Sequence, residues 1–79
     1  ETAKDLISEA LALYETAGDA RRAAEAQVEL AWCYWREGAL DEARVLLANA
    51  TRRLADAPEP ALRALALIRR AVVEKEAMK

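Results

Sequence analysis

The sequence predicts an all-α protein, and three observations lead to that prediction. Its 79 residues are 54% hydrophobic and 33% charged, and they are rich in Ala, Leu, Arg and Glu, which lose little on entering a helix. Only two glycines and two prolines interrupt the chain. Apolar residues recur three and four positions apart in four successive segments. We therefore expect one small domain of four helices that spans residues 1–79.

The first helix is expected at about residues 3–17. Thr2, followed three positions later by Asp5, resembles a capping pair at its start. Gly18 is expected to end the helix, because glycine tolerates the left-handed backbone that follows many helices. The apolar side chains are expected to form one inner stripe, made of Leu6, Ile7, Ala10, Leu11, Leu13, Tyr14 and Ala17.

The second helix is expected at about residues 20–37, with Asp19 as its N-cap and Gly38 as its stop. One apolar face consists of Ala23, Ala24, Gln27, Leu30, Ala31 and Tyr34. A second face consists of Val28, Trp32 and Trp35. Because the apolar arc is so wide, this helix is expected to have neighbours on more than one side.

The last two helices are expected at about residues 40–55 and 60–77. A proline-containing segment, residues 56–60, separates them, since proline disfavours a helical residue before it and suits the first turn of a new helix. The inner stripe of the third helix is expected to be Leu40, Ala43, Leu46, Leu47, Ala50 and Leu54. That of the fourth is expected to be Ala61, Ala64, Leu65, Ile68, Ala71 and Val72.

The short joints predict antiparallel neighbours in an up-down-up-down order. Two arrangements satisfy this order: two stacked helical hairpins, or a closed four-helix bundle. The alanines favour the stack. Ala31 and Ala43 flank the Gly38 turn and Ala50 lies two turns further on, so small residues mark the contact within one hairpin and large residues mark the contacts to either side.

From Gln27 to Ala50 the residues resemble a tetratricopeptide repeat. That family has the pattern W-x2-L-G-x2-Y followed by A-x3-F and a proline. Leu30, Tyr34 and Ala43 match it, Ala31 stands for the small glycine, Leu47 for the phenylalanine, and Gln27 replaces the tryptophan; Pro58 comes a few residues late. The resemblance covers about residues 20–58, and it implies a fragment of a longer repeat protein of the kind found in bacterial regulators.

The phase of the repeat has two solutions. Tyr14, Gly18 and Ala23 have the same spacing as Tyr34, Gly38 and Ala43, twenty residues earlier, so the repeat could begin at the first helix. We prefer the second helix as the first helix of the complete repeat, because Leu30-Ala31 fits the central signature better than Ala10-Leu11 does.

The resemblance also implies where a partner would bind. In the family the first helix of each hairpin presents outward positions to a peptide or helix, and these positions here are Glu25, Val28, Trp32, Trp35 and Arg36. Helix geometry likewise places the last four on the side opposite Leu30, Ala31 and Tyr34. Aromatic residues and arginine are enriched at binding hot spots. The alternative is that the fourth helix or a further repeat covers the two tryptophans.

The remaining function classes are disfavoured by composition. The chain has no histidine, a single cysteine (Cys33) and no glycine-rich phosphate loop, so we expect no enzyme, no cofactor and no metal site. A net charge of −2 disfavours nucleic acid, and no segment approaches the roughly 18 apolar residues of a membrane span. We expect a cytoplasmic scaffold that binds a protein or peptide, or alternatively a structural spacer or self-association segment that forms a homo-oligomer.

Overall fold

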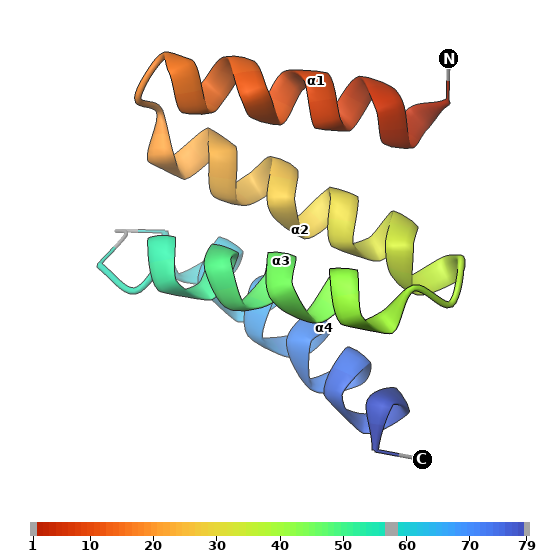
Figure 1. The fold of residues 1–79 in the computed structure, drawn as a ribbon. Helices are drawn as coiled ribbons and strands as arrows, with labels where there is room; N and C mark the ends of the chain where they lie inside the picture. The colour runs from red at the N-terminus through yellow and green to blue at the C-terminus, as the bar shows by residue number, and fades with distance from the viewer. Residues whose placement is uncertain (1, 57–58, 79) are drawn as a thin grey trace.

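The computed structural model describes residues 2–56 and 59–78, and it confirms the predicted all-α class. The four helices are α1 (Ala3–Thr16), α2 (Ala20–Arg36), α3 (Leu40–Arg53) and α4 (Pro60–Ala77), as Figure 1 shows. Each lies within two residues of its predicted ends. Of the predicted proline-containing break, Ala57 and Pro58 lie outside the described residues.

Local hydrogen bonds explain the helix ends. At the start of α1, the Thr2 hydroxyl accepts from the backbone N–H of Asp5 at 3.1 Å and the Asp5 carboxylate accepts from that of Thr2 at 3.3 Å, which completes a capping box. Asp19 caps α2 by accepting from the backbone N–H of Arg22. Gly18 and Gly38 adopt φ values of 74° and 81° after α1 and α2, in the left-handed region where glycine is favoured.

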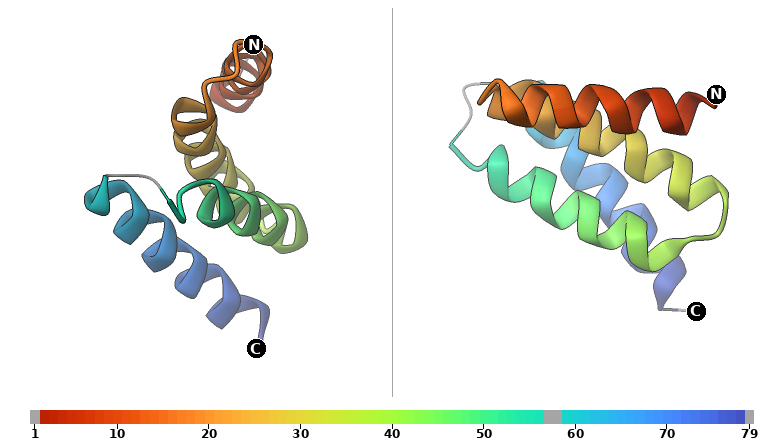
Figure 2. Two further views of the ribbon diagram at one scale, coloured as in Figure 1. Left: turned by 90° about the vertical axis from the view of Figure 1, so that its left-hand side faces the viewer. Right: turned by 45° about the horizontal axis from the view of Figure 1, so that its top comes forward.

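The helices pack as a flat assembly with α2 at its centre. Within the described residues, α2 packs against α1, α3 and α4, and α3 also packs against α4. The backbones of α1 and α4 do not approach each other within the same residues; the left view of Figure 2 shows them on opposite sides of the molecule. The molecule measures 38 × 32 × 16 Å, so its short dimension is little more than one helix diameter.

Most of the core lies where α2, α3 and α4 meet. Its largest fully buried side chains are Leu47, Leu54, Val28 and Val73. Ala31, Ala43 and Ala50, the small residues predicted to mark the close contact of α2 and α3, are all fully buried in this core. Alanine at these positions leaves room for the two helix backbones to approach each other.

The predicted inner stripe of α4 is wrong. The buried residues of α4 are Ala66 and Val73, with Leu62 partly buried against the same core. Of the predicted stripe, Val72 is half-buried, and the other five, Ala61, Ala64, Leu65, Ile68 and Ala71, are exposed. Alanine, leucine, isoleucine and valine occur nearly all round this helix, so hydrophobic spacing alone did not select the face that α3 and α2 cover.

The stripe predicted for α1 is only partly an inner surface. None of the residues in α1, all of which the structure describes, is fully buried. Ile7, Ala10, Leu11 and Tyr14 are half-buried, whereas Leu6 and Leu13 point into solvent with exposed fractions of 51% and 65%. Among the described residues α2 is the one helix that packs against α1, so part of the wide apolar stripe of α1 stays exposed to solvent.

Gln27 is the one fully buried polar residue of the described chain, and its Oε1 atom has no hydrogen-bond partner. A buried polar atom without a partner costs about 1–3 kcal/mol. We therefore expect Gln27→Leu to raise the free energy of unfolding by about 1 kcal/mol in a urea titration followed by circular dichroism. Gln27→Glu, which keeps the shape of the side chain and buries a charge, should lower the free energy of unfolding. If Gln27→Leu also lowered it, the Gln27 amide would have hydrogen-bond partners in the folded protein.

Candidate protein-interaction surface

The five predicted partner-binding residues do not form one surface. Glu25 and Arg36 are exposed, and Trp32 and Trp35 are half-buried. Val28 is 1% exposed and belongs to the core, so its predicted outward position is wrong. The physical reason is that Val28 faces the core to which α2, α3 and α4 all contribute, and Trp35 packs against the same core. Glu25, Trp32 and Arg36 remain available to a partner on the outer side of α2.

Trp32 and Trp35 form a stacked pair at the junction of α2 and α4. Their ring centroids are 4.5 Å apart and their planes differ by 18°. Trp35 packs against the hydrophobic core, and this contact holds the inner side of the stacked pair in place. Arg69 of α4 lies over the Trp32 ring, with its guanidinium carbon 4.7 Å from the centroid, and its Nη1 donates to Glu29 Oε1 at 3.1 Å. The Trp32 ring is therefore held in place while part of it stays accessible.

Charged residues line the outer side of α2 around this aromatic pair. Arg21 pairs with Glu25 at 4.0 Å and with Glu59 at the start of α4. The hydrogen bond to Glu59, followed by the charge of that carboxylate, raises the pKa of Arg21 above its usual value. We call this row the α2 ridge; it consists of the exposed Arg21, Glu25, Glu29 and Arg36 and the half-buried Trp32. It carries two acids, two bases and one aromatic side chain.

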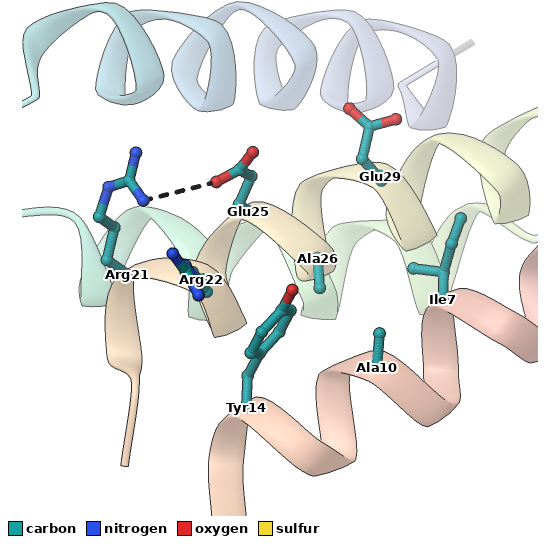
Figure 3. Close-up of a pocket in the computed structure, with 8 residues that line it drawn as sticks. All are labelled: Ile7, Ala10, Tyr14, Arg21, Arg22, Glu25, Ala26 and Glu29. Atoms are coloured by element: carbon teal, nitrogen blue, oxygen red, sulfur yellow. Dashed lines mark ion pairs between the residues drawn. The ribbon is translucent and has the colours of Figure 1, made fainter. Parts of the chain in front are cut away.

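One groove lies between α1 and α2, beside the α2 ridge, with a volume of about 410 Å³ (Figure 3). Its apolar lining consists of Ile7, Ala10, Tyr14 and Ala26; its charged lining consists of Arg21, Arg22, Glu25 and Glu29. In Figure 3 Tyr14 rises from α1 toward α2, and Ile7 and Ala10 continue the same row along α1. The groove therefore has an apolar wall from α1 and a charged rim from α2.

A second groove lies on the other side of the ridge, between α2 and α4. It has a volume of about 340 Å³ and is lined by Arg21, Glu25, Glu59, Ala61, Leu62 and Leu65. Both grooves are open and shallow, and they share Arg21 and Glu25 as a common rim. Such a surface suits an extended or helical partner segment better than a small molecule, which needs an enclosed pocket.

The structure gives no site for metal chemistry in the part of the chain that it describes: no three His, Cys, Asp or Glu side chains lie together. Within the same residues, no helix is both long enough and apolar enough to span a membrane.

Sequence reasoning missed two parts of this surface. Arg69 was not singled out, although it is the residue that fixes Trp32, because its position depends on how α4 crosses α2. The apolar wall of the first groove was assigned to the core. The sequence does show that Ile7, Ala10 and Tyr14 share one face of a helix. It does not show that no second helix covers this face, because that depends on the tertiary arrangement.

We expect Arg69→Gln to lower the free energy of unfolding by no more than about 1 kcal/mol, because a partly exposed ion pair and a cation–π contact are each worth little. The same change should shift the tryptophan fluorescence, since the guanidinium leaves the Trp32 ring. Arg63→Gln, an exposed position on α4, is the matched control and should leave the spectrum unchanged. A loss of stability above about 2 kcal/mol would identify Arg69 as a structural clamp.

Searches of protein-family models, of curated proteins and of solved structures found no match to this chain.

Proposed function

We propose that this chain is a protein-interaction module that binds an amphipathic helix of a partner protein along the α2 ridge. The observation that carries the proposal is the stacked Trp32–Trp35 pair, half-buried at the surface and covered by Arg69, which also donates to Glu29 on the rim of the groove between α1 and α2. A rigid aromatic side chain supplies large contact area at low entropic cost, which is the property of binding hot spots.

The pairing of the helices supports a repeat-type scaffold, and with it the resemblance to tetratricopeptide repeats. In a stack of hairpins each helix packs against the next, and equivalent helices of successive hairpins also touch. Here α2 touches α4, whereas the backbones of α1 and α3 do not approach each other within the described residues. This pattern favours α2 and α4 as the equivalent first helices. A closed bundle would bring α1 against α4.

The chemistry of the grooves indicates the kind of partner. The groove between α1 and α2 presents an apolar wall about two helical turns long, from Ile7 to Tyr14, opposite a rim with two arginines at one end and two glutamates further along α2. A helix with an apolar stripe at i, i+3 and i+7 would place that stripe on the wall. Acidic and basic flanking residues on the partner would face Arg21, Arg22, Glu25 and Glu29. Because both signs are present, the rim would select the orientation of the bound helix.

The test is a selection from a displayed library of random 16-residue peptides against the intact chain. We expect the enriched peptides to have apolar residues at helical spacing, to gain helicity on binding, and to quench or shift the fluorescence of the tryptophan pair. They should lose at least tenfold in affinity for Trp32→Ser, which corresponds to about 1.4 kcal/mol.

The matched control is Val45→Ser, an equally simple change at an exposed position of α3 that lies outside both grooves. It should leave peptide affinity unchanged. Peptides that bind Trp32→Ser as well as the unaltered chain, or that respond only to Val45→Ser, would contradict the α2 ridge as the recognition surface.

A further inference from the structure

A third groove lies between α2 and α3, on the side of α2 that faces away from the α2 ridge. It has a volume of about 380 Å³. We call it the acidic groove, and it is lined by Leu30, Tyr34, Asp41, Glu42, Val45 and Leu46. Leu30 and Tyr34 lie on the side of α2 opposite Trp32, since successive residues of a helix turn by about 100°. The acidic groove shares no residue with the ridge or with the two grooves beside it.

The apolar part of the acidic groove is held in place from one side and open on the other. Lys4 of α1 fixes the Tyr34 ring: its Nζ lies 4.8 Å from the ring centroid and donates to Glu37 Oε1 at 2.9 Å. Val45 is the exposed large apolar residue of α3, with an exposed fraction of 61%. A partner that covered Val45 would remove this apolar surface from water, which favours binding.

Two carboxylates stand at the rim of the same groove without a close cation. Asp41 is 4.0 Å from Arg44 and its side chain is 92% exposed, whereas Arg44 makes two shorter contacts with Glu74 of α4, at 3.0 and 3.3 Å. Glu42 is exposed, and within the described residues its side chain has no ion pair or hydrogen bond. Lys4 does not compensate these charges, because it pairs with Glu37. The groove therefore combines apolar surface with uncompensated negative charge.

We propose that the acidic groove binds a basic amphipathic helix of another protein, in which a Lys or Arg lies four residues from a large apolar side chain. On α3 the acids and the apolar residues have this same spacing: Asp41 precedes Val45, and Glu42 precedes Leu46, by four residues or about 6 Å along the helix. A helix lying beside α3 would place its apolar side chain on Val45 and its cation on the carboxylates one turn away.

The sign of the charge selects among possible occupants. Two carboxylates at the rim attract a basic segment and repel nucleic acid and anionic lipid headgroups, which carry negative charge themselves. Because the acidic residues lie at one end of the groove, they also determine which end of the bound segment carries the cation.

The two acids have a second role inside the chain, which the experiment must separate from binding. They lie in the first turn of α3, where negative charge favours the helix dipole, and the N-cap Ala39 makes no side-chain hydrogen bond there. That role accounts for Asp41 and Glu42 but not for the open apolar side chain beside them. It changes the stability of the helix and predicts no dependence on the charge of an added peptide.

This inference does not rest on the proposed function. Trp32→Ser should leave the affinity for a basic helix in the acidic groove unchanged, and Val45→Ser should weaken it at least fivefold. The α2 ridge predicts the reverse for the peptides that bind there. The two ideas can therefore fail separately.

The experiment titrates two synthetic 16-residue helical peptides into the isotope-labelled intact chain and follows its nuclear magnetic resonance signals. In the Leu/Lys peptide each Leu lies four residues from a Lys on one face, in a background of alanine; in the Leu/Glu peptide Glu replaces each Lys. We expect the Leu/Lys peptide to shift the amide signals of residues 41–46 and of Tyr34. The Leu/Glu peptide should bind at least tenfold more weakly.

The neutral variant Asp41→Asn/Glu42→Gln should lose at least tenfold in affinity for the Leu/Lys peptide. Its matched control is Glu9→Gln/Asp56→Asn, which removes the same charges from exposed positions outside the acidic groove and should change the affinity less than twofold. Circular dichroism verifies that both variants retain their helices.

A charge exchange provides the second arm. Asp41→Lys/Glu42→Lys should bind the Leu/Glu peptide more tightly than the Leu/Lys peptide, a reversal that a weakened α3 cannot produce; if this variant does not fold, the neutral variant and its control decide. The proposal is overturned if the Leu/Lys peptide does not bind, if both peptides bind equally well, or if the neutral variant and its control lose affinity alike. Shifts at the Trp32 indole in place of residues 41–46 would also overturn it.

Discussion

Leu47→Ala is expected to cost about 2–5 kcal/mol, the range measured for removing a large aliphatic side chain from a core. Leu47 is fully buried in the core cluster to which α2, α3 and α4 all contribute. A chain of this size has a total stability on the order of 4–12 kcal/mol. The variant should therefore lose a large part of the total stability and unfold at a clearly lower urea concentration, which a urea titration followed by circular dichroism would measure.

Val45→Ala is the matched control for this prediction. Val45 lies two residues away on the same helix and is 61% exposed, so its truncation removes little buried area. We expect a change within about 0.5 kcal/mol, the usual range for surface positions. Similar losses at the two positions would mean that α3 does not sit at the centre of the core as the structure describes.

Ala31→Leu is expected to have the second largest effect, a loss of about 1–3 kcal/mol from overpacking. Ala31 has no exposed surface and belongs to the same core as Ala43 and Ala50 of α3. Three added carbon atoms would force α2 away from its neighbours or drive the leucine off its preferred rotamers. Because the α2 ridge depends on α2 and α4 staying in contact, the variant should also change the stacking signal of the tryptophan pair in near-ultraviolet circular dichroism.

Ala12→Leu serves as its control, because Ala12 is exposed on α1 and the added side chain would extend into solvent. It should leave both stability and the near-ultraviolet spectrum close to those of the unaltered chain. If Ala31→Leu proved equally harmless, the close contact of α2 and α3 through small residues would be wrong.

The helices and their ends could be predicted from the sequence because their determinants are local. Thr2 and Asp5 form the predicted capping box, Asp19 caps α2, and Gly18 and Gly38 have the positive φ values that end the helices preceding them. Each of these features depends on residues within one or two turns of each other. Tertiary contacts add little to such ends, which explains why the predicted and observed boundaries nearly coincide.

The faces of the helices could be predicted only where apolar residues occupy one side. On α3 a single stripe through Ala43, Leu47 and Ala50 is both predicted and buried. On α4 two apolar stripes compete, and the structure buries the one through Ala66 and Val73, because α3 and α2 both lie on that side. The angle at which α4 crosses its neighbours decides between them, and that angle is not encoded in any local pattern.

The candidate surface, too, could be predicted only where its residues depend on local helical spacing. Helical spacing predicts Trp32 and Arg36 on the outer side of α2, and the resemblance to tetratricopeptide repeats adds Glu25; Glu25 and Arg36 are exposed there and Trp32 is half-buried. Helical spacing also predicts Val28 on that side, because it lies four residues before Trp32, but Val28 is buried in the core that α2, α3 and α4 form. Arg69 joins the surface because α4 packs against α2, from a position 37 residues after Trp32 in the chain (69 minus 32).

The central claim is that the α2 ridge recognises a partner helix, and the indole N–H resonances of the two tryptophans test it most directly. We would titrate a selected peptide into isotope-labelled protein and follow amide and indole signals by nuclear magnetic resonance. The account predicts the largest shifts at the Trp32 indole and at amides of Glu25, Glu29 and Arg36, with α1 residues along the first groove responding next. Shifts confined to the outer side of α3 around Val45, with unchanged indole signals, would contradict it.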